Sequence, residues 1–240
     1  MRALLGVIRM VLACMVVVIG LVACALAPLM SRRFFFTLAR IWHRTLLLII
    51  GIKIHYSGDR SEKTAFFVGN HVSWADILVV GAHWPVVFLA RSDIANWPIL
   101  GWIIKVAGTL FIERGKGAEK ALKQIKEALE QGQSVVIFPE GKTSDGSSVR
   151  KMQPRLFQAA IDANSELRVF CLKYQFASGA LADSLTYEGS VTFMQSFWRT
   201  VSGPAVDCYL TVKDPEPAQG DRQSLAKSAE SWVANLLKSN

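Results

Sequence analysis

An uncharged apolar run near the N-terminus constrains this chain more than any other feature. Residues 10–31 are 22 consecutive residues without a charged side chain. A helix needs about 20 apolar residues to cross the hydrocarbon core of a bilayer, so this run is long enough to anchor the chain in a membrane. A second apolar run, residues 45–52, is too short to span. It would continue a helix that starts near residue 34, and we expect it to lie at the membrane interface.

The positive charge of the chain is concentrated in the same region. The net charge is +8, and residues 1–53 contain seven Arg and Lys residues but no Asp or Glu, which leaves +1 for the other 187 residues. A nucleic-acid-binding protein would carry its basic patch on the folded domain. Here the cations flank apolar helices instead, which favours contact with an anionic membrane surface on the cytoplasmic side.

Beyond residue 57 the pattern changes to short apolar strands that alternate with helices. We expect strands at residues 64–68, 86–90, 109–112, 134–138, 169–174 and 206–212, and helices at 70–82, 116–131 and 221–238. A strand, a helix and a strand within about 30 residues form a βαβ unit with parallel strands. The sequence therefore predicts a membrane-anchoring helical segment, 1–57, followed by an α/β domain, 58–240. Its sheet should be mixed, largely parallel and flanked by helices.

One alternative for the N-terminal segment is a lipoprotein signal. Residues 21–24 read Leu-Val-Ala-Cys and resemble a bacterial cleavage site before Cys24. Arg9 lies inside the apparent signal, however, and the apolar run continues past Cys24 to Leu29. These two features favour an uncut helix.

No metal or cofactor site is predicted. The cysteines are Cys14, Cys24, Cys171 and Cys208, and the histidines are His43, His55, His71 and His83. Neither set has the spacing of a metal site. The cysteines are typical of buried thiols in a reducing compartment.

A polar segment follows the expected strand at residues 64–68. Residues 70–76 read Asn-His-Val-Ser-Trp-Ala-Asp. Residues five apart do not share a face of a regular helix, but a histidine just before a helix can fold back onto the carboxylate. Asp76 would then hold the Nδ1 proton of His71 and leave Nε2 free to accept one, as in a catalytic triad. Alone, the pattern fits a helix cap beside a surface histidine equally well.

Two further polar segments follow expected strands, where α/β folds usually bind ligands. Residues 111–115, Phe-Ile-Glu-Arg-Gly, contain Arg114. Its guanidinium either binds a phosphate through two parallel hydrogen bonds or is an ordinary surface charge. Residues 138–146 form a Gly-rich polar loop that offers Lys142, hydroxyls and amides to an anion. The loop is not a P-loop, because a P-loop needs a glycine where this chain has Val136. It is not a nucleophile elbow, because its glycine-to-serine spacing is one residue too long.

Together the three segments resemble the glycerolipid acyltransferase family, which includes the bacterial 1-acylglycerol-3-phosphate acyltransferases. The motifs that carry the resemblance are Asn-His-x-Ser-x-x-Asp at 70–76, Phe-Ile-x-Arg at 111–114 and Phe-Pro-Glu-Gly-x-x-Ser at 138–144. The resemblance covers about residues 60–212. The family usually has a proline in a strand near residues 169–171, where this chain reads Val-Phe-Cys. That motif is thought to shape the acyl-binding site in the family, so the resemblance does not imply a preferred acyl chain length for this protein.

The resemblance implies an O-acyltransferase that moves a fatty acyl chain from an acyl thioester to the hydroxyl of a lysolipid. The donor would be acyl-CoA or acyl carrier protein, with no cofactor. The expected acceptor is 1-acyl-sn-glycerol-3-phosphate, and the alternative acceptor is another lysolipid such as lyso-ornithine lipid. A non-catalytic membrane-anchored lipoprotein is the alternative of a different class. The expected location is a bacterial inner membrane, with the domain at 58–240 facing the cytoplasm.

Carried over by position, the resemblance implies that His71 is the catalytic base and Asp76 its partner. The residues implied to bind substrate are Asn70, Ser73, Arg114, Glu140, Gly141, Lys142, Thr143 and Ser144. The acyl group would move directly to the acceptor, without a protein nucleophile. We expect backbone amides near the helix start to hold the oxyanion.

Overall fold

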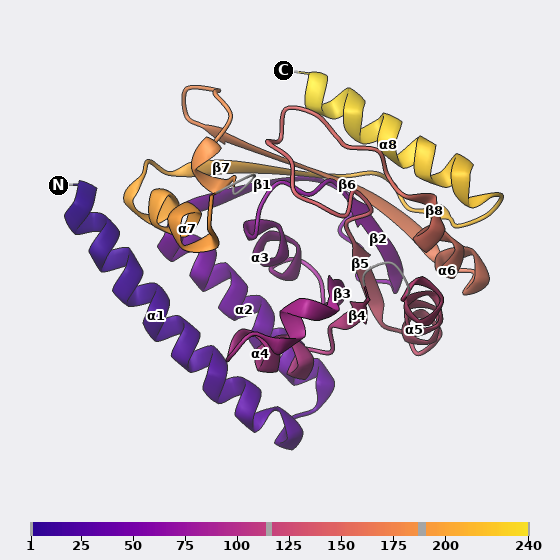
Figure 1. Cartoon of the computed structure of the whole chain (residues 1–240), viewed down its shortest axis with the longest axis horizontal. Coiled ribbons are helices and arrows are strands. Elements are labelled where there is room, and N and C mark those ends of the chain that lie inside the picture. Colours follow the sequence, from indigo (N-terminus) through magenta and orange to yellow (C-terminus); the bar gives the residue numbers. More distant parts are fainter. Residues whose placement is uncertain (1, 114–116, 187–190, 240) are drawn as a thin grey trace.

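The computed structural model describes residues 2–113, 117–186 and 191–239, and these fold around one mixed β-sheet (Figure 1). The strands lie in the order β1-β7-β6-β2-β5-β3-β4, and β8 pairs with β6. Their bounds are β1 Ile52–Gly58, β2 Ala65–Gly69, β3 Val86–Arg91, β4 Leu110–Ile112, β5 Ser134–Ile137, β6 Glu166–Phe176, β7 Val206–Val212 and β8 Glu216–Pro217. Among them, β6 is antiparallel to β7 and β8, and the other pairs are parallel. The predicted α/β class with a mixed, largely parallel sheet is confirmed.

Helices cover both faces of this sheet (Figure 1). The α-helices are α1 Arg2–Leu26, α2 Arg32–Ile50, α3 Ala75–Gly81, α4 Leu100–Val106, α5 Ala118–Glu130, α6 Phe157–Asp162, α7 Phe193–Ser202 and α8 Arg222–Lys238. Short 3-10 helices are η1 Ala27–Leu29, η2 Ser92–Asn96, η3 Pro154–Leu156 and η4 Asp183–Leu185. One core contains residues of α1, α2, α3 and α7, and a second core contains residues of α5, α6 and α8.

The central strand β2 shows how the sequence produces two cores. All five of its residues are buried, because strands flank it on both sides and helices cover both sheet faces. Successive side chains of a strand point to opposite faces. Phe67 therefore joins the core with α2 and α3, while Phe66 and Val68 join the core with α5 and α8.

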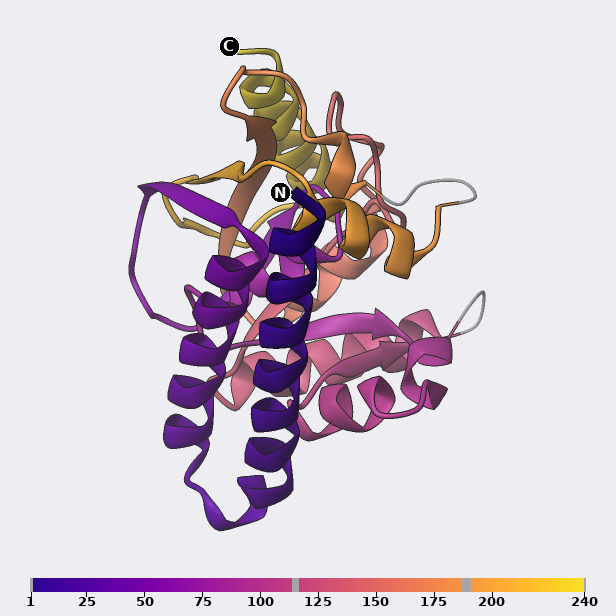
Figure 2. The same ribbon diagram turned by 90° about the vertical axis from the view of Figure 1, so that its left-hand side faces the viewer.

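The N-terminal helices pack against each other as a hairpin along one side of the molecule (Figure 2). Residues Ala3–Leu29 form a helical segment long and apolar enough to cross a membrane. Of its most apolar stretch of 18 residues, 11% is buried in the protein. One apolar N-terminal helix was expected, and it is present.

The second apolar run, residues 45–52, differs from its expected interfacial position. It ends α2 and begins β1, and Leu46, Leu47 and Ile50 are buried in the core shared with the sheet. Gly81 permits this packing, because a Cβ there would lie 2.6 Å from the His43 ring. The predicted domain boundary between residues 57 and 58 falls within β1, which pairs with β7. The two segments therefore share one core.

A buried arginine ties the beginning of β6 to the segment before β2. Arg168 is 0% exposed. Its guanidinium lies 2.9 Å from Asp59 Oδ2 and 3.1 Å from Glu166 Oε2, and it donates to the Ser61 carbonyl at 2.6 Å. It also lies over the Phe67 ring, 5.6 Å from the centroid. These partners compensate the loss of hydration that burial imposes on the cation.

We expect Arg168→Ala to lower the free energy of unfolding by about 3 kcal/mol, because it removes the cation and leaves the carboxylates of Asp59 and Glu166 without their partner. Urea denaturation in detergent measures this loss. Lys126→Ala is the matched control, since Lys126 forms an exposed pair with Glu130, and such pairs contribute about 0.5 kcal/mol or less. Equal losses in the two variants would contradict the assigned role of Arg168.

Candidate active site

The parallel strands bring two of the three polar segments together. β2 and β5 are neighbouring parallel strands, so the segments that follow them leave the same edge of the sheet. The Ser144 amide donates to the His71 carbonyl at 2.8 Å, and the His71 amide donates to Glu140 Oε1 at 2.8 Å. The His71 ring stacks on the Phe138 ring, with centroids 4.3 Å apart and planes inclined by 16°.

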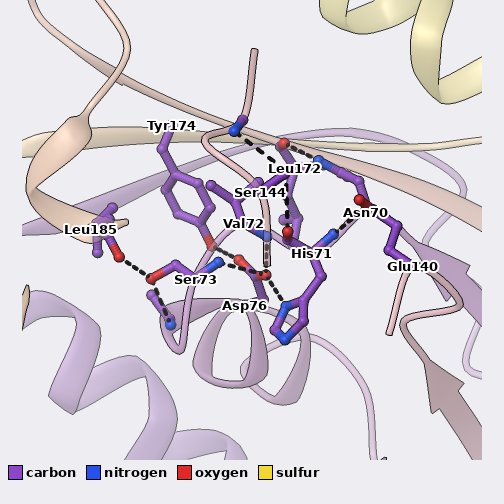
Figure 3. A network of polar contacts seen from close by, with 12 residues as sticks. Asn70, His71, Val72, Ser73, Asp76, Glu140, Ser144, Leu172, Tyr174 and Leu185 are labelled. Carbon is purple, nitrogen blue, oxygen red and sulfur yellow. Dashed lines mark hydrogen bonds and ion pairs between the residues drawn. The ribbon is translucent and has the colours of Figure 1, made fainter. Parts of the chain in front are cut away.

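His71 and Asp76 form the expected pair (Figure 3). The His71 Nδ1 atom lies 2.7 Å from Asp76 Oδ2. The same oxygen accepts hydrogen bonds from the Val72 amide at 2.8 Å and the Ser73 amide at 3.0 Å. The turn before α3 therefore wraps around the carboxylate, which is how residues five apart come into contact.

This geometry defines the tautomer of the catalytic candidate. The Asp76 carboxylate is 0% exposed and accepts at Nδ1, whereas the His71 side chain is 19% exposed. A neutral imidazole that donates from Nδ1 carries its lone pair on Nε2. In the described part of the chain, Nε2 has no hydrogen-bond partner. His71 is thus arranged to accept a proton from a bound substrate.

Tyr174 is a site residue that the sequence did not indicate. Its hydroxyl donates to Asp76 Oδ1 at 2.7 Å, so both oxygens of the carboxylate are engaged (Figure 3). Burial, together with the Asp76 charge, raises the pKa of Tyr174 well above its usual value. The hydroxyl therefore remains protonated and remains a donor. The only feature of the sequence that pointed to Tyr174 was its position at the end of the expected strand at residues 169–174.

Glu140 connects the loop after β5 to the catalytic turn. Its second oxygen, Oε2, accepts from the Arg150 amide at 2.9 Å, while Oε1 accepts from the His71 amide. Burial raises the pKa of the Glu140 carboxyl, and the two amide hydrogen bonds oppose that rise. With both oxygens bound to backbone amides, Glu140 holds the loop against His71.

Asn70 and Ser73 are also bonded within the protein. Asn70 is 0% exposed, and its amide group accepts from the Leu172 amide and donates to the Leu172 carbonyl, both at 2.8 Å. It thereby continues the pairing of β2 with β6 past the end of β2. Ser73 is 0% exposed and its hydroxyl donates to the Leu185 carbonyl at 2.8 Å. Their predicted contact with substrate remains a prediction.

The remaining implied residues lie in the loop after β5 or outside the described residues. Ser144 is 4% exposed and its hydroxyl donates to the His71 carbonyl at 3.3 Å. Gly141 and Lys142 are exposed, and Thr143 is half-buried. Gly141 has a φ of +72°, which suits glycine. Arg114 lies outside the described residues, so its predicted phosphate contact stays a prediction.

These contacts limit which amides near the start of α3 can hold an oxyanion. The amides of His71, Val72 and Ser73 are bonded to the carboxylates of Glu140 and Asp76. They are consequently not available to a substrate oxygen. Within the described ranges, the amide of Trp74 at the start of α3 has no partner, and neither do the amides of Lys142 and Thr143 in the adjoining loop.

The described residues show no metal centre, and the two cysteines of the sheet are not activated as nucleophiles. No group of three or more His, Cys, Asp or Glu side chains there is placed to hold a metal ion. Burial raises the pKa of the Cys208 thiol well above its usual value, and burial raises that of Cys171 to about 12. Both thiols stay protonated, and protonated thiols are poor nucleophiles.

Comparisons with known proteins show the family of this chain. The acyltransferase family matches residues 52–174. The chain is 32% identical to the lyso-ornithine lipid O-acyltransferase of Pseudomonas aeruginosa over 202 residues. This match covers 83% of this chain and 78% of the relative. It is 30% identical to that of Brucella abortus over 98% of this chain and 96% of the relative. It is 34% identical to the 1-acyl-sn-glycerol-3-phosphate acyltransferase of Neisseria gonorrhoeae over 65% of this chain and 61% of the relative.

The fold has a counterpart among solved structures. The crystal structure of the 1-acyl-sn-glycerophosphate acyltransferase PlsC from Thermotoga maritima matches with a TM-score of 0.76 over 99% of this chain and 97% of that chain, at 16% identity. The relatives at 30% identity or more are O-acyltransferases, and this chain is one as well. The chain belongs to the acyltransferase family.

We expect His71→Ala to lower acyl transfer by about 10²–10⁴-fold, the usual contribution of a general base, without loss of the fold. Asp76→Asn should be similarly damaging, because the amide no longer fixes the tautomer. Turnover per folded enzyme, with circular dichroism as the folding control, measures both effects. Near-normal turnover in a folded His71→Ala protein would exclude His71 as the base.

Tyr174→Phe tests whether the hydroxyl acts through the carboxylate. Without this donor, Asp76 Oδ1 is left unpaired in the core, and the carboxylate holds the His71 ring less firmly. We expect kcat to fall roughly tenfold, as for a lost hydrogen bond to a charged group, with little change in KM. An unchanged kcat with lowered thermal stability would instead make Tyr174 a purely structural residue.

Proposed function

We propose that this protein transfers a fatty acyl chain from an acyl thioester to the hydroxyl of a lysolipid. The observation that carries the proposal is the His71 imidazole, bound to Asp76 at Nδ1 with Nε2 unpartnered in the described residues. A base in this state removes the proton of an alcohol as the oxygen attacks a carbonyl carbon. Lysolipids provide such an alcohol, and the relatives carry names of lysolipid acyltransferases.

The reaction proceeds in one addition and one elimination. Nε2 of His71 takes the hydroxyl proton while the acceptor oxygen bonds to the thioester carbon. The intermediate then expels the thiolate, which receives the proton from the imidazolium, and the products are an ester and a free thiol. The Asp76 carboxylate stabilises the imidazolium between these steps. The amides of Lys142 and Thr143 are our candidates for the oxyanion donors.

The acceptor that similarity favours is lyso-ornithine lipid. The relatives from Pseudomonas aeruginosa and Brucella abortus carry that name and match 83% and 98% of this chain. The Neisseria gonorrhoeae 1-acyl-sn-glycerol-3-phosphate acyltransferase matches 65% of it. This order reverses the expectation drawn from the motifs, and 1-acyl-sn-glycerol-3-phosphate becomes the second candidate. The donor is acyl-CoA or acyl carrier protein. A non-catalytic lipoprotein is not supported, because the relatives are enzymes.

We also propose that α1 lies along the cytoplasmic surface of a bacterial inner membrane rather than across it. The α/β domain flanks the hairpin at both ends. Near the start of α1, Gly6 contacts Ser202. Near the start of α2, Arg33 lines a cavity together with Gln131. A crossing hairpin would carry this polar surface into hydrocarbon, which is costly. A protein held this way should resist extraction by high salt and be released by detergent.

A panel of lysolipids with one labelled acyl donor tests the proposed acceptor. Lyso-ornithine lipid should be acylated with the highest kcat/KM, and 1-acyl-sn-glycerol-3-phosphate should be the weaker acceptor. His71→Ala, as the matched control, should lose both activities together, because one base serves either hydroxyl. A preference for 1-acyl-sn-glycerol-3-phosphate would reverse the order of acceptors, and no transfer to any lysolipid would disprove the proposed function.

A further inference from the structure

Helix α7 has an inverted arrangement of polar and apolar side chains. Two of its three buried residues are Ser196 and Thr200, which are 0% and 1% exposed. By contrast, Phe193, Met194 and Trp198 are 42%, 61% and 41% exposed. A helix that faces water places its apolar residues inward and its polar residues outward. The outer face of α7, defined here by Met194 and Trp198, is therefore suited to apolar surroundings.

The inner face of α7 contacts the turn that carries the catalytic pair. The Trp74 indole Nε1 donates to Ser196 Oγ at 3.1 Å, and the Trp74 ring lies 5.5 Å from the Phe193 ring. The Leu185 carbonyl accepts from Ser196 Oγ at 3.0 Å and from Ser73 Oγ at 2.8 Å, the latter drawn in Figure 3. The position of α7 is thus coupled to that of the turn around His71.

The C-terminal end of α7 packs on the apolar helix α1. A Cβ at Gly6 would lie 2.8 Å from Ser202 Cβ, so glycine permits the close approach. The Arg9 guanidinium donates to the carbonyls of Val201 at 3.2 Å and Gly203 at 3.4 Å. Figures 1 and 2 both place α7 beside the N-terminal part of α1. α7 therefore connects the anchoring helix to the active site.

We propose that the outer face of α7 inserts into the interfacial region of a phospholipid bilayer, next to α1. The inference rests on the proposed function, in which a bilayer-resident lysolipid is the acceptor. Insertion would hold the turn around His71 at the membrane surface, where the acceptor hydroxyl lies. Residues 193–202 lie beyond the part of the chain that the acyltransferase family matches, so this role is additional to the motifs.

A bilayer is the occupant that the surrounding surface favours. Exposed apolar side chains also lie on α1, the helix that packs on α7, where Leu4, Val7 and Val11 are 66%, 50% and 54% exposed. Trp198 suits the membrane interface, where indole rings are enriched. Arg199, the next residue, is exposed and can reach lipid phosphates while its stem stays among apolar groups. An amphipathic element of this kind binds through buried apolar area together with attraction to anionic lipid.

Quenching of tryptophan fluorescence by brominated phospholipid vesicles locates α7 directly, without any need for activity. Trp198→Phe in the full chain should remove part of the bromine-quenchable fluorescence, because bromine quenches only indoles that contact lipid. Trp232→Phe is the control, since Trp232 is half-buried against the core on the other face of the sheet and should contribute none. An unchanged quenchable fraction in Trp198→Phe would overturn the proposal.

Glutamate substitutions test the consequence for catalysis. Met194→Glu and Trp198→Glu should lower the ratio of activity on vesicle-embedded lysolipid to activity on a short-chain, water-soluble lysolipid by about tenfold, given the cost of removing a large apolar side chain from lipid. Tyr209→Glu is the matched control, because Tyr209 is similarly exposed, at 42%. Its neighbours Cys208 and Leu210 in β7 point into the core shared with α7, so Tyr209 points to the opposite face of the sheet, away from α7.

The outcomes separate this inference from the proposed function. An unchanged ratio in the α7 variants, or an equal fall in Tyr209→Glu, would overturn the role of α7 while leaving lysolipid transfer intact. A wild-type protein inactive on every lysolipid would disprove the proposed function. The fluorescence experiment would still determine whether α7 contacts lipid.

Discussion

The buried carboxylate of Asp76 is the group on which the site depends. An ionised carboxylate without access to water is stable only when hydrogen-bond donors surround it. Its two oxygens accept from the His71 ring, the amides of Val72 and Ser73, and the Tyr174 hydroxyl. Those donors come from the turn after β2 and from β6, and the parallel pairing of β2 with β6 sets their separation. The sheet thereby assembles a base whose orientation needs no help from substrate.

Short-range patterns in the sequence were sufficient to predict much of the fold. The strands at residues 64–68 and 134–138 and the helix at 116–131 were visible as apolar runs and as helical periodicity, because burial on one or both faces determines both patterns. Strand β1 was not predicted. Its residues alternate weakly, and it forms a strand only because it pairs with β7, far away in the sequence. The apolar run before it was assigned to a membrane interface, since sequence cannot distinguish lipid from a protein core as the apolar partner.

The candidate site was predicted to a similar extent. His71 and Asp76 stood in a local motif, and the structure places them within hydrogen-bonding distance. Asn70 stood in the same motif, yet its side chain is committed to the backbone of Leu172. Tyr174 had no local signal, because its partner Asp76 lies 98 residues earlier. A motif shows which residues act together, but it does not separate the side chain that reaches substrate from the one that supports the fold.

The pairing of β1 with β7 has a consequence for how the chain is made. Ser57 and Thr211 share a hydrogen bond across 154 residues, so β1 leaves the ribosome long before the strand that receives it. At about 5–20 residues per second, that interval is roughly 8–30 s. During it, the surfaces of β1 and α1 that later contact β7 and α7 have no protein partner. Insertion of the nascent hairpin into lipid would shelter these surfaces, and translation beside the membrane would then be part of folding rather than a later delivery step.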